Sequence, residues 1–396
     1  MANVSSSNGL EKRPKLRFPN FDEPWQSTLL SSVFAKNTKK NTDGQITNVI
    51  CNSAKQGLIP QREYFDKDIA NSDNTSGYYI IEENDFVYNP RKSSDAPYGP
   101  ISSYKYPDAG IVSPLYLCFR AKGAINPSFY EWYFRSSAWH RYVYMSGDSG
   151  ARHDRVSIKD DVFFAMPISI PSAREQEHIA SFLDMIDQRI DKQRALVDNL
   201  KKYKRGVTNA IFNRKLIFSS EDSPYPQWEE KYIGDICKIQ TGKSNTQDET
   251  SQGIYPFYVR SPIVRKSNRY LLDCEAVLTV GDGVGTGKVF HYVQGRFDLH
   301  QRVYAMTDFK MVSGKYFYYY FAHFFYDRVM RMTAKTSVDS VRYEMIDRMT
   351  ILVPCKEEQQ KIVCFLDRIE KKIKNAEEEL NLLEKNKSGF LQQLFI

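Results

Sequence analysis

Apolar residues recur at alternating steps of four and three along two stretches of the chain, residues 171–212 and 354–395. Such spacing places them on one narrow stripe of an α-helix, and its persistence over about five heptads is typical of a coiled-coil seam. The pattern predicts two helices of roughly 40 residues, each about 60 Å long at 1.5 Å per residue. The predicted seam positions are Ile179, Leu183, Ile186, Ile190, Val197 and Leu200 in the first stretch and Ile362, Leu366, Ile369, Ile373, Leu380 and Leu383 in the second.

The two stretches are also copies of one another. Aligned without gaps at an offset of 183, they share 14 identical residues over 42 positions. A gap-free match of this length argues for an internal duplication. The identical pairs include Glu175/Glu358, Gln176/Gln359, Asp184/Asp367, Gly206/Gly389 and Phe212/Phe395.

The helix starts and the shared glycines give further expectations. Ser172 with Glu175 predicts a capping box, whereas Cys355 predicts a weaker or different cap in the second copy. Gly206 and Gly389 are expected to mark a bend, a helix end or a close helix contact, because glycine costs about 1 kcal/mol inside a helix. We expect the two seams to pack on each other as an antiparallel pair. The alternative is that each seam packs on its own globular domain.

The segments before each helix have a different composition. They are rich in Tyr, Phe, Val, Ile, Gly and Pro, which predicts short strands and turns. "GYYIIEENDFVYNPRK" and "RYLLDCEAVLTVGDGVGTGK" occupy matching places in them, and Trp25 and Trp228 stand at their starts. The predicted fold class is α+β, with two β-rich domains each followed by a long helix. The predicted divisions are a flexible tail (1–14), a first domain (15–165), a central helix (166–215), a second domain (216–350) and a C-terminal helix (351–396).

Composition narrows the function classes only slightly. The 396 residues carry a net charge of +7, which is compatible with a polyanionic partner without requiring one. The six cysteines form no CxxC pair, and the six histidines are scattered, so no metal site is predicted. The sequence shows neither a signal-peptide pattern nor a membrane span, and the protein is expected to be cytoplasmic.

Motifs for catalysis are missing from the sequence. "GDGVGTGK" (281–288) lacks the first glycine and the following Ser or Thr of a P-loop, and it lacks the third glycine of the dinucleotide fingerprint. It is either a glycine-rich loop that faces DNA or a plain β-hairpin turn. "YNPRK" (88–92) has only part of the motif of adenine methyltransferases. We therefore expect no catalytic residues and no cofactor in this chain.

The order domain, helix, domain, helix resembles the DNA specificity subunit of type I restriction–modification systems. The resemblance is carried by the helix starts at 171–184 and 354–367, the late "KKYKRGVTNAIF" and "EKNKSGFLQQLF", and the openings "FPNFDEPW" and "YPQW". It implies two target recognition domains, each reading half of a split double-stranded DNA site, held by an antiparallel coiled coil. It also implies docking of two methyltransferase subunits that use S-adenosylmethionine, and of restriction subunits that use ATP and magnesium.

DNA contacts are expected from basic side chains on phosphates and from Asn or Arg on base edges. Arg155 and Arg342 are predicted to occupy matched places before the two helices. Alternatives to a DNA reader are a coiled-coil scaffold for a protein or carbohydrate partner, an enzyme with an unrecognised site, and a specificity subunit of a methylation-only system. The candidates are Asn89, Arg91, Lys92, Tyr98, Arg152, His153 and Arg155 in the first domain and Lys243, Arg265, Lys266, Lys288, Arg302 and Arg342 in the second.

Overall fold

The computed structural model describes residues 3–4, 13–64, 75–147, 154–219, 225–283, 285–332 and 340–396. The chain divides into two compact units, residues 1–193 with 379–396 and residues 194–378. Both divisions fall inside the long helices, so each unit contains part of both helices. The divisions predicted from the sequence instead treat each helix as a separate segment. Most of the predicted tail lies outside the described residues.

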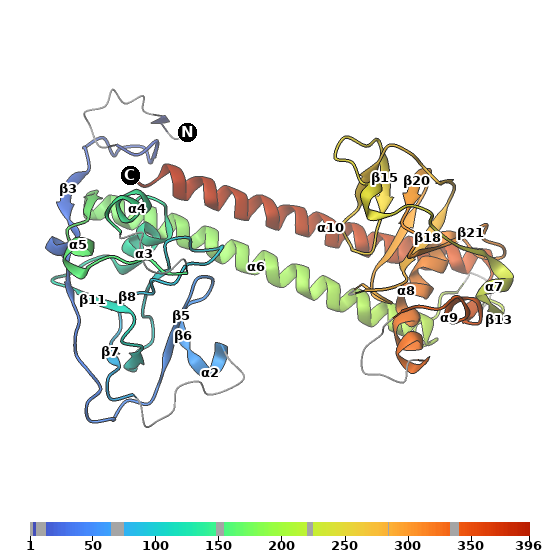
Figure 1. The fold of residues 1–396 in the computed structure, drawn as a ribbon, viewed down its shortest axis with the longest axis horizontal. Coiled ribbons are helices and arrows are strands. Elements are labelled where there is room, and N and C mark those ends of the chain that lie inside the picture. The colour runs from blue at the N-terminus through green and yellow to red at the C-terminus, as the bar shows by residue number, and fades with distance from the viewer. Residues whose placement is uncertain are drawn as a thin grey trace. The chain divides into compact units, whose positions relative to one another are not determined.

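The first unit is built from short strands and helices that precede the first long helix (Figure 1). Its central sheet is antiparallel, with the strand order β4-β11-β8-β9. Strands β3 and β12 pair with each other in a separate two-stranded sheet. The elements are β1 (Asn3–Val4), β2 (Leu16–Arg17), β3 (Gln26–Leu29), α1 (Leu30–Val33), β4 (Phe34–Lys36), β5 (Ile50–Ser53), β6 (Gly57–Pro60), α2 (Gln61–Tyr64), β7 (Tyr79–Ile81), β8 (Phe86–Tyr88), β9 (Ile101–Ser103), β10 (Gly110–Val112), β11 (Leu117–Ala121), α3 (Pro127–Arg135), α4 (His140–Ser146), α5 (Asp160–Phe164) and β12 (Pro167–Ile170).

The second unit repeats this plan. Its central sheet has the antiparallel order β14-β21-β18-β19, and β13 pairs with β22. A further sheet, β16-β15-β20-β17, contains one parallel pair. The elements are β13 (Glu229–Tyr232), α7 (Ile233–Ile236), β14 (Lys238–Thr241), η2 (Thr246–Asp248), β15 (Tyr255–Tyr258), β16 (Arg265–Ser267), β17 (Leu272–Asp273), β18 (Ala276–Val280), β19 (Phe290–Val293), β20 (Arg296–Leu299), β21 (Val303–Thr307), α8 (Gly314–Met332), α9 (Tyr343–Asp347) and β22 (Thr350–Val353).

The two central sheets are equivalent strand by strand. In each, the strand after the first short helix (β4 or β14) pairs with the last strand of the sheet (β11 or β21). That strand then pairs with the central strand (β8 or β18), which pairs with the next (β9 or β19). The predicted duplication therefore extends into the β-rich domains, where the sequences have diverged but the topology has not. The α+β fold class is confirmed.

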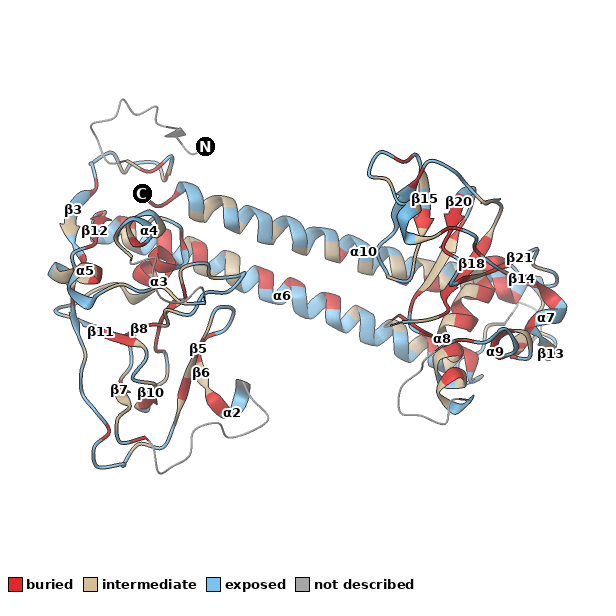
Figure 2. Cartoon of the chain, in the orientation of Figure 1, coloured by how far each residue is buried: buried red, intermediate tan, exposed pale blue. Residues whose placement is uncertain are grey.

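Each domain has its own buried core, red in Figure 2, and aromatic side chains are prominent in both cores. In the first, Trp25 packs with the sheet and α3, and in the second, Trp228 packs with α8. Apolar residues at or just after the end of each long helix join these cores: Ile211 and Phe212 enter the second, and Phe395, two residues beyond the second long helix, enters the first. The tryptophans predicted to open each domain are thus buried core residues.

The long helices are α6 (Ala173–Phe212) and α10 (Lys356–Gln393), close to the predicted lengths. Within each unit they run antiparallel, and the ion pairs between them are duplicated as well. Lys204 of α6 binds Glu370 of α10, and Lys387 of α10 binds Asp187 of α6. All twelve predicted seam residues are buried or half-buried. Further pairs between the helices are Lys201–Glu377 at 2.6 Å and Arg189–Glu379 at 2.9 Å.

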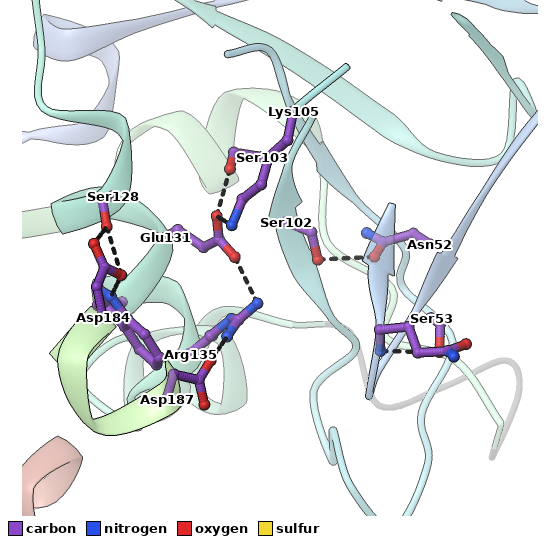
Figure 3. Close-up of polar contacts among 12 residues, drawn as sticks. Asn52, Ser53, Ser102, Ser103, Lys105, Ser128, Glu131, Arg135, Asp184 and Asp187 are labelled. Atoms are coloured by element: carbon purple, nitrogen blue, oxygen red, sulfur yellow. Dashed lines mark hydrogen bonds and ion pairs between the residues drawn. The ribbon is translucent and has the colours of Figure 1, made fainter. Parts of the chain in front are cut away.

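A joint between domain and helices explains why Asp184 is repeated. The Asp184 carboxylate accepts a hydrogen bond from the Ser128 hydroxyl at 2.8 Å (Figure 3). It accepts another from the Trp132 indole N–H at 2.7 Å, and both donors are on α3. Lys387 of the other helix lies 4.9 Å from the centre of the Trp132 ring and binds Asp187. One aromatic side chain of α3 thus contacts both helices.

The second domain has the same joint built from different residues. Asp367 accepts hydrogen bonds from the Lys315 ammonium at 3.0 Å and the Tyr319 hydroxyl at 2.5 Å, both on α8. Lys204 lies 5.5 Å from the centre of the Tyr319 ring and binds Glu370. Because the joint requires an acid on one helix and a lysine on the other, both residues are retained in the two copies.

The helix starts depart from the predicted capping box. The Ser172 hydroxyl accepts the backbone N–H of Glu175 at 3.3 Å, as expected for an N-cap. The Glu175 side chain does not reach back to the cap, because it forms a bidentate ion pair with Arg17, with both contacts at 2.8 Å. The other shared residue, Gln176, donates its amide to the Pro171 carbonyl at 3.0 Å. The second hydrogen bond of the predicted capping box, from the backbone N–H of Ser172 to the Glu175 carboxylate, is therefore wrong.

The shared glycines mark neither a helix end nor a close contact. Gly206 and Gly389 lie within α6 and α10, and a Cβ built at either position meets no atom within 4 Å. Those two expectations are wrong. We predict that Gly206→Ala and Gly389→Ala each raise the free energy of unfolding by about 0.5–1 kcal/mol, because glycine is the poorer helix former. Urea unfolding of each variant measures this, and an unchanged or lower midpoint would contradict it.

Candidate nucleic-acid interface

The loop that follows β8 carries the first group of basic candidates. The backbone N–H of Val156 donates to the Pro90 carbonyl at 2.8 Å, and Arg91 forms an antiparallel β-bridge with Arg155. Two segments 64 positions apart in sequence therefore lie side by side. This backbone pairing brings both arginines, predicted separately, to one place.

A hollow of about 840 Å³ opens at this loop, and several predicted residues line it. Arg91 and Lys92 are exposed there, and the Arg155 guanidinium lies 4.0 Å from the Asp154 carboxylate. Lys55, which was not among the predicted residues, also lines the hollow. Its walls include Cys51, Asn52, Ser53, Asn89, Pro90, Asp95, Leu115 and Tyr116.

Two other first-domain candidates, Asn89 and Tyr98, make contacts within the domain itself. The Asn89 amide donates to the Asn52 carbonyl at 3.2 Å, and its side-chain oxygen accepts the backbone N–H of Arg91 at 3.1 Å. The side chain therefore shapes the loop. Tyr98 is half-buried, with its ring centre 4.7 Å from that of His140. The candidates Arg152 and His153 lie outside the described residues.

The loop that follows β18 is held in the same way. The backbone N–H of Val341 donates to the Gly281 carbonyl at 2.7 Å, and Asp282 forms an antiparallel β-bridge with Ser340. The loop connects the antiparallel strands β18 and β19, so "GDGVGTGK" lies in a β-hairpin connection, and a role of this loop in facing DNA stays a prediction. The Asp282 carboxylate lies 3.4 Å from the Arg260 guanidinium and 3.7 Å from that of Arg302.

These bridges correct the predicted pairing of Arg155 with Arg342. Ser340 takes the place of Arg155, because each bridges the loop after the central strand of its domain. Arg342 instead precedes α9 as its N-cap residue, the position that Lys159 holds before α5. The sequence comparison therefore misplaced the counterpart by two positions.

The remaining second-domain candidates are more scattered. Lys243 is exposed, and Arg265 and Lys266 lie on β16, an edge strand, where Arg265 is 3.3 Å from Glu249. Lys288 lies at the far end of the β18–β19 loop, 5.1 Å from the centre of the Tyr326 ring. Among the predicted residues in the described part of the chain, Arg302 alone has a side chain that contacts Asp282, at 3.7 Å.

His300 is buried close to the charged side chains of Arg260, Asp282 and Arg302. Burial lowers the pKa of His300 from its ordinary value; Arg260 and Arg302 lower it further, and Asp282 opposes them. Its Nδ1 accepts the backbone N–H of Arg302 at 3.1 Å, which requires an unprotonated Nδ1. The imidazole thus supports the loop in its neutral form.

We predict that acid weakens the second domain partly through His300. Because its folded-state pKa is lowered, its contribution to stability is present above about pH 6.5, the unfolded-state pKa, and is lost as the pH falls through the folded-state value. His300→Asn keeps an acceptor but cannot gain a proton. Its urea midpoint should fall less than that of the wild type between pH 7.5 and pH 5.5. An equal fall in both proteins would contradict the prediction.

The candidates predicted from the sequence do not include Arg260 and Asp282, because neither residue belongs to a basic cluster in the sequence. Arg260 stands two residues after β15, and Asp282 lies in the glycine-rich loop, where only Lys288 was selected. The available signal was the alignment of the two segments after β8 and β18. It would have placed Asp282 opposite Arg91.

Among the described residues, no group of three or more His, Cys, Asp or Glu side chains is placed to hold a metal ion. Among the same residues, every helix is too short or too polar to cross a membrane.

Sequence comparisons match this chain to one family. Residues 225–385 match the family model described as the type I restriction modification DNA specificity domain. The EcoDI specificity subunit of Escherichia coli is 22% identical over 165 residues, which are 42% of this chain and 36% of that protein. The MjaIX specificity subunit of Methanocaldococcus jannaschii is 22% identical over 271 residues, 60% of this chain and 61% of that protein. The matches thus span less than two thirds of these curated relatives.

Solved structures share the fold over almost the whole chain. The type I specificity subunit from M. genitalium superposes with a TM-score of 0.61 at 13% identity, covering 97% of this chain and 99% of the other. A chain from a study of complex assembly and conformational transition in a type I system gives 0.60 at 16% identity, covering 95% and 98%. In sequence and in fold, this chain therefore resembles the specificity subunits of type I restriction–modification systems, and its residues 225–385 match their DNA specificity domain.

Proposed function

We propose that this chain is the DNA-reading specificity subunit of a type I restriction–modification complex, with one domain for each half of a split, asymmetric site. The observation that carries the proposal is one framework used twice with different loops. Both domains have the same central sheet order and the same joint to the helices. The loops after β8 and β18 differ in sequence and in charge. Two different reading surfaces suit two half-sites of different sequence.

Exposed basic side chains in both domains support a DNA partner. Arg91 and Lys92 are exposed in the first domain, as are Lys243 and Arg302 in the second. Lysine and arginine on phosphates supply most of the affinity of proteins for DNA, and side chains on base edges supply the sequence preference. We propose that the loops after β8 and β18 provide both kinds of contact.

The long helices are proposed to dock two methyltransferase subunits, with restriction subunits completing a complex that cleaves. Each unit leaves apolar side chains exposed on its part of the helices: Met185 and Leu382 in the first, Leu196 and Tyr203 in the second. Exposed apolar groups on an otherwise charged helix are suited to a protein contact. S-adenosylmethionine, ATP and magnesium belong to those partners in this proposal, and no catalytic step is assigned to this chain.

The salt dependence of DNA binding by the purified chain tests the proposal. If six or more phosphates are contacted, affinity for duplex DNA should fall about a thousandfold or more between 50 and 200 mM salt. Lys92→Ala and Arg302→Ala should each weaken binding and reduce the slope of log affinity against log salt by about 1. Lys374→Ala removes the same charge from an exposed site on α10 and should leave the slope unchanged. Absence of salt-dependent binding would favour the scaffold for a protein or carbohydrate partner.

A further inference from the structure

The two domains place residues of opposite charge at one equivalent position. Arg91 and Asp282 each follow the central strand of their sheet, and each forms the antiparallel bridge that holds its loop. The residue before each accepts the backbone N–H that follows the bridging partner. The backbone frame is therefore the same, and only the side chain that it presents differs.

An acid at this position is unexpected on a surface that binds a polyanion. A carboxylate facing phosphates is repelled, so an acid is suited to such a surface when it faces a base edge. Two guanidiniums, those of Arg260 and Arg302, lie 3.4 and 3.7 Å from Asp282 and offset its charge. An ionised carboxylate has about four lone-pair sites, and each Asp282 oxygen contacts one guanidinium, so each oxygen keeps a site that can accept from a ligand.

Base edges offer a matching donor for each side chain. In the major groove, guanine presents two acceptors that match the arginine fork, while cytosine N4 and adenine N6 present amino donors. Resting on the proposed function, we propose that Arg91 reads a guanine in one half-site and that Asp282 reads the exocyclic amino group of a cytosine or adenine in the other. The charge at this one position then sets which base each half-site requires.

Selection from a pool of random DNA duplexes by the purified full chain tests the inference. The wild type should enrich two short elements at a fixed spacing. Asp282→Ala should lose the preference for cytosine or adenine at one position of one element, by about tenfold in relative affinity. Asp282→Asn should favour adenine there, because an amide pairs with the N6 and N7 of adenine. Arg91→Ala should lose a guanine in the other element only.

Two controls make the result specific. Asp273→Asn makes the same chemical change at another Asp–Arg pair of this domain, 2.9 Å from Arg296, and should leave the selected site unchanged. Replacing the selected adenine by purine, or the selected cytosine by pyrimidin-2-one, removes the amino group. That replacement should weaken the wild type about tenfold and leave Asp282→Ala unaffected. The affected analogue also identifies which of the two bases is read.

The outcomes separate this inference from the proposed function. If the wild type enriches no sequence, both fail. If the wild type enriches a split site that Asp282→Ala and Asp282→Asn retain in full, the inference fails and the proposed function stands. Loss of a guanine preference, or a uniform loss of affinity, would also overturn it, because Asp282 would then act only by holding Arg260 and Arg302.

Discussion

Phe395→Ala is expected to lower the free energy of unfolding of the first domain by about 3–5 kcal/mol, although the residue is next to last in the chain. Phe395 is buried, with its ring centre 5.7 Å from that of Phe129, 6.1 Å from Tyr133 and 6.5 Å from Trp25. Truncation would leave a cavity among these rings. Hydrogen exchange of the first domain, resolved by peptide, measures the local loss of stability.

The matched variants define the specificity of this effect. Leu382→Ala truncates a side chain of α10, the helix that precedes Phe395, where Leu382 is 57% exposed, and should change stability by less than about 0.5 kcal/mol. Phe212, the duplicate of Phe395, packs 5.1 Å from the centre of the Tyr320 ring, so Phe212→Ala should instead destabilise the second domain. If the first domain of Phe395→Ala kept the hydrogen-exchange protection of the wild type, the view that Phe395 completes the core of this domain would be refuted.

Arg17→Met is the second change with a large expected effect, again about 3–5 kcal/mol of unfolding free energy. Arg17 donates two hydrogen bonds to Glu175, whose side chain is only 1% exposed. Removing the guanidinium leaves a buried carboxylate without its partner, and that desolvation cost is not recovered. Urea unfolding followed by tryptophan fluorescence measures the loss.

A double variant tests the physical cause. Arg17→Met with Glu175→Gln removes the stranded charge as well as the pair, and should recover a large part of the lost stability. Buried ion pairs are often replaceable as a unit even when neither partner is replaceable alone. Additive losses in the double variant would show that the pair acts by packing and not through its charge.

The features predicted from the sequence are those that local periodicity determines. The seam residues, such as Ile190 and Ile373, repeat at helical spacing over many turns, so both the long helices and their pairing could be predicted. The matching strands β8 and β18 likewise follow from short, nearly continuous runs of apolar residues. Such patterns are fixed by neighbouring residues, and no distant contact is needed to produce them.

The features that could not be predicted depend on contacts between distant segments. Glu175 has the spacing of a capping box, but a residue 158 positions away takes its carboxylate. Asn89 has the chemistry of an adenine reader, yet its amide holds the loop. An alignment of the segments after β8 and β18 matches Arg91 with Asp282, but only the backbone bridges between distant segments show that the two residues hold the same place in the fold.

The adenine-methylation map of the host genome, with this gene intact and disrupted, is the most direct test of the central claim that the chain reads a split DNA site. The account predicts that one methylated motif with two short elements and a fixed unread gap disappears on disruption. Exchange of one recognition domain should then change one element and leave the other. A host whose methylated motifs are all unchanged, although the methyltransferase partner is expressed and active, would contradict the account.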